Sequence, residues 1–287
     1  MIKHVALSII FAMLFSIPQA MAKDGAGGLT FSLSPSTIVQ GDPFIVRVHG
    51  AAGGPSGQAF GRELSFVPCA SGKGCYEALG SAMIEDSAGS HVIVVSAGER
   101  KASARMRVIA GKWKTISLTL PPDKVELSEE DELRADMEEV RLKAIWAIKS
   151  ERLWSGRFVA PLDTEVSTGF GVRRDMNKGM KISVHKGVDM RGTMGLPVRA
   201  ANSGRVVLTE ELYFGGNTLV LDHGAGVYTV YMHLSEFKSA VGDAVAKGDT
   251  VALVGSTGRS TGPHLHYTVK VAGESVNPEA MPKLDLK

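Results

Sequence analysis

From Leu29 to about Leu120 the chain alternates apolar and polar residues with a period of two. Residues 44–49 show the alternation clearly, whereas residues 91–95 form an apolar run typical of a more fully buried strand. Successive side chains of a β-strand point to opposite faces, so the pattern predicts short strands, separated here by turns rich in Gly, Pro and Ser. Several such strands predict an antiparallel β-sandwich of immunoglobulin-like size across residues 23–122.

The period changes after residues 115–120, the last strand expected in this sandwich, because Pro121-Pro122 cannot continue a central strand. The stretch Ser128-Glu-Glu-Asp131 resembles a capping box, and its acids suit the positive end of a helix dipole. The pattern predicts one amphipathic connecting helix within residues 123–153, with its apolar side packed on a neighbouring domain. The apolar residues at helical spacing are Leu133, Met137, Val140, Ala144 and Ile148.

From Trp154 onward the chain returns to short apolar strands, and glycines mark the turns between them. Residues 205–208, 218–221 and 227–231 are examples. This turn-dense pattern predicts a compact antiparallel C-terminal domain over residues 154–287. The expected fold class is therefore mainly β.

Length and charge narrow the function classes. A chain of 287 residues with 44% hydrophobic residues is long enough for two domains of ordinary size. Its formal net charge of +2 comes from nearly balanced acids and bases, which argues against a nucleic-acid-binding protein because such proteins carry a basic stripe.

The N-terminus has the features of a processing segment. Lys3 is followed by a mostly apolar run over residues 5–17, which is short for a membrane span, and Ala20-Met21-Ala22 matches a signal-peptidase site. We expect residues 1–22 to be a signal peptide, with no stable membrane insertion after cleavage. An uncleaved anchor is the alternative.

Cys69 and Cys75 are the two cysteines of the chain. In an exported protein an even cysteine count favours a disulfide, and the flexible residues between these two allow a small loop to close. Two free thiols are the alternative.

Three short stretches of the C-terminal part bring histidines together with an aspartate. They read His185-x-x-x-Asp189, Tyr231-x-His233 and His264-x-His266. A catalytic zinc ion needs three protein ligands and one open position, and nearby bases must move the proton of its water. The joint occurrence of the three stretches predicts such a site.

Strand geometry supports part of this site. Alternation places His264 and His266 on one face, with Leu265 turned into the core, and it gives Tyr231 and His233 a common face. In a straight strand His185 and Asp189 would lie roughly 13 Å apart, so we expect a bend at Gly187. Spacing alone leaves open which histidines bind the metal.

Three other histidines are interpreted as structural. His49 and His91 stand alone on strand-like segments, and His223 lies in a predicted turn.

The three stretches, together with Gly169-Phe-Gly171 and the segment from Gly255 to His266, resemble the signature of the lysostaphin-type (LytM-domain) zinc metallopeptidases. The resemblance covers roughly residues 155–280 and implies antiparallel sheets with an open groove and zinc at its floor. It implies that the ligands of Zn²⁺ are His185, Asp189 and His266, and that His233 and His264 are catalytic residues that do not bind the metal.

The resemblance also implies a substrate, since this family cleaves the peptide cross-bridges or stem peptides of bacterial peptidoglycan. With the signal peptide and the disulfide, it predicts an exported endopeptidase in the periplasm or cell envelope, and secretion stays an open alternative. The domain and helix upstream are expected to restrict or orient access to the groove; a regulatory protein partner stays unknown.

Two other readings remain. Some relatives have lost metal ligands and act as non-catalytic activators of other cell-wall hydrolases. Residues 241–255 also resemble part of a biotinyl or lipoyl carrier domain, which would need a modifiable lysine at Lys247.

Overall fold

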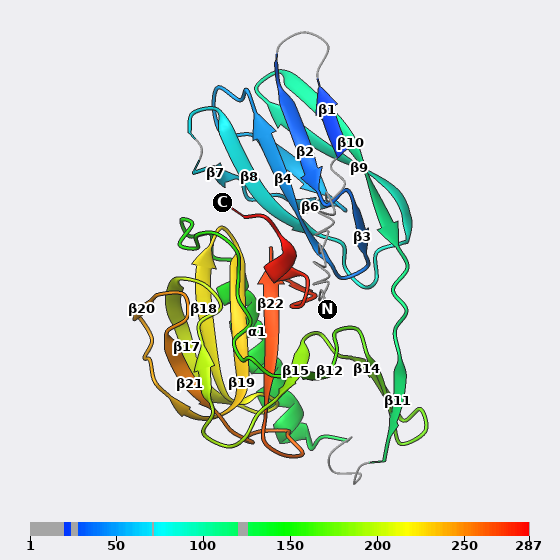
Figure 1. The fold of residues 1–287 in the computed structure, drawn as a ribbon. Coiled ribbons are helices and arrows are strands. Elements are labelled where there is room, and N and C mark those ends of the chain that lie inside the picture. The colour runs from blue at the N-terminus through cyan, green and yellow to red at the C-terminus, as the bar shows by residue number, and fades with distance from the viewer. Residues whose placement is uncertain (1–19, 24–27, 71, 120–125, 287) are drawn as a thin grey trace, which may run out of the picture.

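The computed structural model describes residues 20–23, 28–70, 72–119 and 126–286. Most of the predicted signal peptide, residues 1–19, lies outside the described residues. The fold is mainly β, as expected, with an N-terminal β-rich part stacked on a C-terminal one (Figure 1). Within the described ranges, no helix has the length and apolar character needed to cross a membrane.

The N-terminal part is a sandwich of two five-stranded sheets. The first has the order β1-β2-β4-β8-β7, with β1 Ala20–Lys23, β2 Thr30–Ser34, β4 Pro43–His49, β8 Cys75–Ser81 and β7 Val67–Pro68. The second has the order β3-β10-β9-β5-β6, with β3 Thr37–Val39, β10 Arg100–Ile109, β9 Gly89–Ala97, β5 Ser56–Ala59 and β6 Arg62–Glu63. Their inward-facing side chains, among them Phe31, Phe44, Ile93 and Met106, form one buried core.

For the sandwich, the predicted disulfide is confirmed and the predicted fully buried strand is wrong. The predicted disulfide between Cys69 and Cys75 is formed. The run at residues 91–95 is not buried on both faces, because Val92 and Val94 are 53% and 41% exposed while Ile93 and Val95 are buried. Strand β9 therefore has one core face and one solvent face, as in most antiparallel sheets.

The strand expected at residues 115–120 forms as β11 (Thr115–Leu118), but it does not belong to the sandwich. It pairs in parallel with β13 (Arg173–Met176), which pairs in turn with β14 (Lys181–Val184). Trp113, just before β11, packs edge-on against Phe170. The chain leaving the sandwich thus adds a strand to a hairpin of the C-terminal part.

The C-terminal part is built on a ten-stranded sheet whose main path runs β12-β15-β22-β19-β18-β17-β20. Strands β16, β21 and β23 join this path at β19 and β22. The bounds are β12 Val166–Thr168, β15 Val188–Arg191, β16 Pro197–Arg199, β17 Gly204–Leu212, β18 Gly216–Gly224, β19 Val227–Phe237, β20 Ala244–Val245, β21 Thr250–Val254, β22 His264–Val271 and β23 Glu274–Val276. A short 3₁₀ helix, Met281–Lys283, follows.

Helix α1 (Glu129–Trp146) begins as predicted, since the Ser128 side chain accepts a hydrogen bond from the backbone N–H of Asp131. The side of the helix that we expected to be buried is exposed, with Leu133, Met137 and Val140 each more than 60% accessible.

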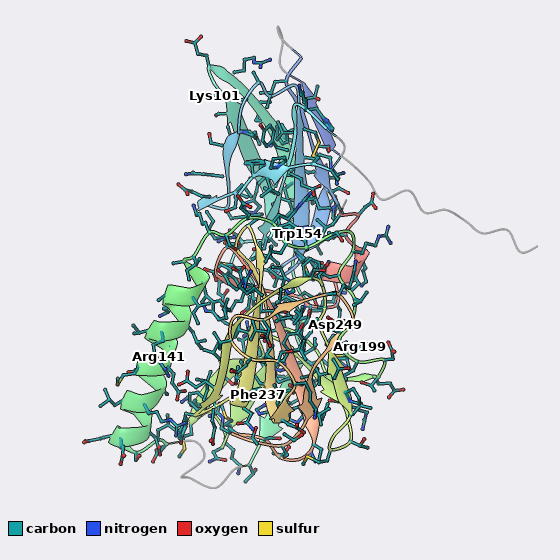
Figure 2. The ribbon with its side chains drawn as sticks, turned by 90° about the vertical axis from the view of Figure 1, so that its left-hand side faces the viewer. Lys101, Arg141, Trp154, Arg199, Phe237 and Asp249 are labelled. Atoms are coloured by element: carbon teal, nitrogen blue, oxygen red, sulfur yellow. A yellow bond between two sulfur atoms is a disulfide. The ribbon has the colours of Figure 1, made fainter. Side chains whose placement is uncertain are left out.

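The opposite side of α1 faces the sheet instead (Figure 2). Leu142, Ile145 and Trp146 pack there on Tyr228, whose hydroxyl donates to the carbonyl of Ile145. Glu138 is also buried on this side, where it accepts hydrogen bonds from Arg134 and from the backbone N–H of Tyr213. The side of α1 with Trp146 and the hydrogen-bonded Glu138 is therefore buried, and the side with the regularly spaced apolar residues is exposed.

The two β-rich parts share buried contacts. Ile45 and Leu79 of the sandwich belong to the same apolar core as the C-terminal sheet. Glu77, which is 1% exposed, forms ion pairs with Arg47 of the sandwich and with Arg152, just beyond α1. The sandwich is therefore packed on the C-terminal part.

Candidate metal centre and catalytic groove

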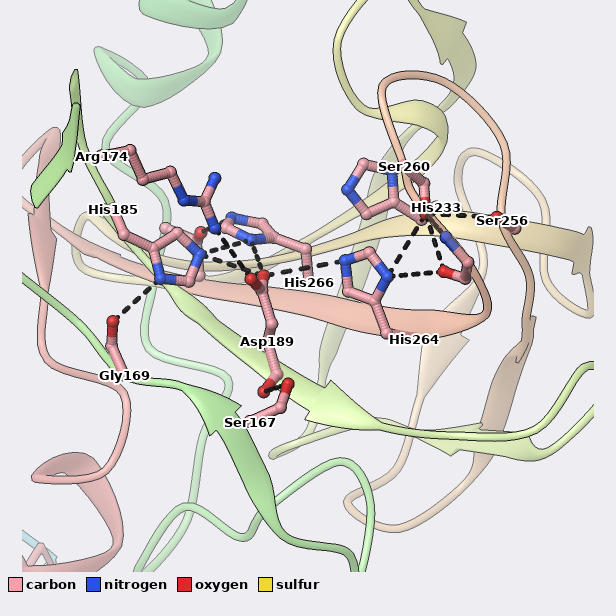
Figure 3. Close-up of polar contacts among 12 residues, drawn as sticks. Ser167, Gly169, Arg174, His185, Asp189, His233, Ser256, Ser260, His264 and His266 are labelled. Carbon is pink, nitrogen blue, oxygen red and sulfur yellow. Dashed lines mark hydrogen bonds and ion pairs between the residues drawn. The ribbon is translucent and has the colours of Figure 1, made fainter. Parts of the chain in front are cut away.

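Three of the predicted site residues, His185, Asp189 and His266, meet in one small cluster at the paired strands β15 and β22 (Figure 3). Asp189 and His266 are direct partners in the register of these strands, and His185 is the first residue of the connection between β14 and β15. The His185 Nε2 lies 3.0 Å from Asp189 Oδ1 and 3.0 Å from His266 Nδ1, and the latter two atoms are 2.8 Å apart.

The cluster fits a tetrahedral zinc ion in its donor types and spacing. Two imidazoles and one carboxylate are a donor set that catalytic zinc uses, and bond lengths of about 2.0–2.1 Å imply ligand atoms about 3.3 Å apart. The observed separations of 2.8 to 3.0 Å are close to that value. The three residues are therefore placed to hold zinc, each through one atom.

Hydrogen bonds behind the two imidazoles fix their orientation. His185 donates a hydrogen bond from Nδ1 to the carbonyl of Gly169 at 2.9 Å. The lone pair of Nε2 is therefore free to bind a metal ion. His266 Nε2 lies 3.1 Å from the hydroxyl of Thr268, so its Nδ1 faces the cluster. Such outer contacts set the tautomer and ring orientation of metal-binding histidines.

Asp189 is held as a carboxylate. Burial alone would raise the pKa of its carboxyl group, but hydrogen bonds with His185 and His266 outweigh burial and lower the pKa far below its usual range. Its second oxygen, Oδ2, accepts a hydrogen bond from Arg174 Nη2 at 2.8 Å. Oδ1 is therefore turned to the cluster while Oδ2 is bound on the other side.

Gly187 provides the bend expected between His185 and Asp189, and it also allows close packing. A Cβ atom at Gly187 would lie 2.6 Å from the carbonyl oxygen of Tyr267 and 2.8 Å from His266 Nε2. The connection between β14 and β15 thus lies directly against β22, and a larger residue would separate His185 from His266.

His264 and His233 stand beside the cluster as an imidazole pair, with ring centroids 4.7 Å apart. His264 donates from Nδ1 to the carbonyl of Gly262 at 2.8 Å, and its Nε2 lies 3.8 Å from Asp189 Oδ1. His233 donates from Nδ1 to the carbonyl of Thr257 at 2.8 Å. In its neutral form each ring therefore carries its proton on Nδ1, and Nε2 is the nitrogen that can accept a proton.

Burial, with a smaller contribution from the neighbouring His264 and His266, lowers the pKa of His233 to about 4, so His233 is neutral near pH 7. Burial also lowers the pKa of His266, which favours the neutral form that a metal requires.

The alternation argument for the 264–266 segment is confirmed, since Leu265 is fully buried in the core while His264 and His266 both lie near Asp189. The argument for Tyr231 and His233 is wrong. Tyr231 lies in the core, and His233 reaches the site because its backbone adopts φ +62° where the pairing of β18 and β19 is irregular. A positive φ is uncommon for residues other than glycine and interrupts strand alternation.

His223 lies outside the site, in line with its structural interpretation, although it belongs to strand β18 and not to a turn. It is fully buried, with Nδ1 2.8 Å from the carbonyl of Ser203 and Nε2 2.8 Å from the hydroxyl of Thr229. His91 bonds the carbonyl of Ser87 in the sandwich. Lys247 donates to the backbone carbonyls of Ser155 and Arg157, so it is not the free lysine of a carrier domain.

Arg174 is the residue of this centre that we did not predict. It stands on β13 and reaches the carboxylate of Asp189 across the hairpin. The only signal in the sequence was its place just after the Gly169-Phe-Gly171 turn. No spacing rule connects that turn with Asp189, because β11 and β14 place the hairpin through tertiary pairing.

An open cleft extends on each side of the metal cluster. One cleft, of about 680 Å³, is lined by Asp189, His264, Thr168 and Arg191. The other, of about 780 Å³, runs from His266 to helix α1. Both clefts are open to solvent, and each is lined by residues of the cluster.

Residues 183–278 match the family model of peptidase family M23. The C-terminal part of the chain contains an M23 domain. This segment includes all five clustered site residues, whereas the sandwich, α1 and Arg174 lie outside the matched residues.

Curated relatives match the M23 domain. The DD-carboxypeptidase/endopeptidase Mpg of Neisseria meningitidis serogroup B is 41% identical over 116 residues, which is 40% of this chain and 26% of the relative. The peptidoglycan DD-endopeptidase ShyA of Vibrio cholerae is 38% identical over 119 residues, 41% of this chain and 28% of the relative. The chain thus covers between a quarter and a third of these relatives.

A solved structure extends the likeness beyond the M23 domain. A protein of Pseudomonas aeruginosa assigned to peptidase family M23 superposes with a TM-score of 0.66 at 26% identity. The superposition covers 85% of this chain and 94% of that one. The arrangement of sandwich, helix and M23 domain is therefore shared with that protein.

Proposed function

We propose that the chain is an exported zinc-dependent endopeptidase that hydrolyses peptide cross-links of bacterial peptidoglycan. One observation carries the proposal: two imidazoles with available Nε2 atoms stand beside a His-Asp-His donor set in an open groove. In this assignment His185, Asp189 and His266 bind the metal, and His233 and His264 are the catalytic residues.

When bound, zinc polarises a peptide carbonyl and brings the pKa of water to about 7. His185 and His266 contribute neutral imidazoles, and Asp189 contributes a negative charge on Oδ1. Arg174, which neutralises Oδ2, keeps the carboxylate in this orientation.

His233 and His264 move protons in this mechanism. Each holds its own proton at Nδ1 on a backbone carbonyl, so each can receive the proton of the attacking water at Nε2. The same atom can then return the proton to the leaving amine. A protonated imidazole in this position also donates a hydrogen bond to the developing oxyanion.

The substrate assignment is supported by the relatives, of which Mpg is named a DD-carboxypeptidase/endopeptidase and ShyA a peptidoglycan DD-endopeptidase. Cross-linked stem peptides of peptidoglycan are therefore the substrate class that we propose. A cell-envelope location, reached through the predicted signal peptide, suits this substrate, and the Cys69–Cys75 disulfide suits an oxidising compartment.

Fragment release from purified sacculi tests this function. The chain from residue 23 to residue 287, loaded with zinc, should release peptides whose masses identify the cleaved bond. A chelator should stop release and added zinc should restore it. A metal-free protein that releases nothing yet stimulates another wall hydrolase would support the non-catalytic activator instead.

A further inference from the structure

Strand β22 presents a row of polar side chains along one face. His264, His266, Thr268 and Lys270 alternate with Leu265, Tyr267, Val269 and Val271, which are all buried in the core. Because alternate residues of a strand share a face, Lys270 lies on the same side as the metal cluster, about 13 Å along the strand from His266. The row therefore continues the floor of the groove.

Helix α1 forms the wall of the groove at this end. The cleft of about 780 Å³ is bounded by Leu142 and Trp146 of α1, by Met232 of β19, and by His266 and Lys270 of β22. Met232 is the register partner of His266, so the two strands present one continuous surface. Since α1 lies outside residues 183–278, this wall is not part of the matched M23 domain.

Lys270 places a cation in the cleft, where the charges of Glu274 and Glu139 act on it without forming a direct ion pair. Its ammonium group donates to the carbonyl of Gly273 at 3.3 Å and lies 5.7 Å from the ring centroid of Trp146. Among the ion pairs of the described residues, none involves Lys270, whereas Lys143 on the same cleft is paired with Glu139 at 2.7 Å. Burial lowers the pKa of Lys270 more than the charge of Glu274 raises it, and a bound anion would further stabilise the charged ammonium group.

We propose that the cleft between α1 and β22 is a substrate subsite in which Lys270 binds a carboxylate of the peptide undergoing cleavage. Trp146 and Met232 contact the aliphatic part of the same peptide. An extended chain advances about 3.3–3.6 Å per residue, so the carboxylate lies within about four residues of the cleaved bond. The inference rests on the proposed function, because it treats the cleft as one arm of the catalytic groove.

Cleavage of cross-linked peptides released from sacculi tests the subsite, using one sample with free carboxylates and one converted to carboxamides. For the zinc-loaded chain, kcat/KM should fall about tenfold on amidation, the range expected for one charge-assisted hydrogen bond. For Lys270→Gln, kcat/KM on the free-carboxylate sample should be about tenfold lower than in the wild type, and nearly equal for the two samples. Lys270→Arg should restore the preference for free carboxylates.

Lys238→Gln is the matched control, since Lys238 lies outside the cleft and pairs with Glu236 at 2.6 Å. It should keep the wild-type preference for free carboxylates. Equal losses in Lys238→Gln and Lys270→Gln, or a Lys270→Gln variant that still prefers free carboxylates, would overturn the subsite.

Calorimetric binding of the two peptide samples to zinc-loaded His264→Ala separates this inference from the proposed function. Tighter binding of the free carboxylates, lost on adding Lys270→Gln, supports the subsite even if no bond is cleaved by the wild-type chain. Cleavage without any carboxylate preference would instead leave the endopeptidase standing and remove the subsite.

Discussion

The guanidinium of Arg174 lies 2.8 Å from Asp189 Oδ2, on the side of the carboxylate away from His185 and His266. Arg174 lies on β13 of the three-stranded sheet, whereas Asp189 lies on β15 of the ten-stranded sheet. The contact fixes the rotation of the carboxylate, so that Oδ1 is the oxygen presented to the metal cluster.

Arg174→Gln is therefore expected to weaken zinc binding. Loss of a residue that hydrogen-bonds to a metal ligand reduces metal affinity by roughly 10- to 100-fold. The zinc affinity of Arg174→Lys should lie between those of Arg174→Gln and the wild type. Zinc titration against a competing chelator measures the effect. Arg105→Gln, which removes an exposed arginine of the sandwich, is the control, and an equal loss there would refute a specific role for Arg174.

Gly187→Ala is expected to disturb the metal cluster without touching a ligand. Its methyl group would meet the hydroxyl of Thr268 and the backbone of Tyr267, forcing the connection that carries His185 away from β22. Zinc affinity should fall, and the melting temperature should fall with it. Gly53→Ala, whose Cβ meets nothing within 4 Å, should change neither quantity. Wild-type zinc affinity in Gly187→Ala would contradict the close packing of this loop.

His223 is expected to make the protein less stable in acid. Burial lowers its pKa from 6.5 to about 4, so the unfolded chain binds a proton below pH 6.5 that the folded chain does not. The free energy of unfolding should therefore decline as the pH falls from 6.5 toward 4, by about 2 kcal/mol at pH 5 from this residue.

The measurement is urea unfolding of the metal-free chain at pH 7.5 and pH 5, because metal ligands also exchange protons. His223→Gln should flatten this part of the decline, while His49→Gln, at an exposed position, should not. A pH dependence unchanged by His223→Gln would show that another group is responsible.

The segment between the sandwich and α1 is expected to support the metal centre. Residues 154–287 alone lack β11, which pairs with β13, and lack the Trp113 ring that packs on Phe170. This fragment should bind zinc more weakly and melt at a lower temperature than the chain from residue 23. A fragment from residue 111, which keeps β11 and α1, should recover part of the difference. Equal zinc affinity and activity of residues 154–287 and the longer chain would argue against this support.

Local sequence patterns predicted the helices and strands more reliably than they predicted which face of each is buried. The helix at α1 followed from its cap at Ser128 and its 3.6-residue spacing, yet its regular apolar stripe faces solvent. Which side of a helix is buried depends on the surface it meets, and here Tyr228 and the backbone of Tyr213 select the side with Trp146 and Glu138.

The proximity of the five candidate residues was predictable from the sequence, but the local geometry that brings them together was only partly so. Alternation explains His264 and His266, whereas the positive φ of His233 has no signal in the sequence. Arg174 was missed for a related reason, since its contact with Asp189 depends on the pairing of β11, β13 and β14. The bend at Gly187 was foreseen, while its close approach to β22 required the tertiary structure.

The central claim is the division of the five residues into three metal ligands and two proton-transferring imidazoles. Bound zinc and the rate of cross-link cleavage, measured on the same samples of His185→Ala and His233→Ala, test it most directly. The account predicts that His185→Ala loses both zinc and cleavage, whereas His233→Ala keeps about one zinc per chain and loses most turnover, by about 10²- to 10⁴-fold. Loss of zinc in His233→Ala, or full cleavage by His185→Ala, would contradict the account.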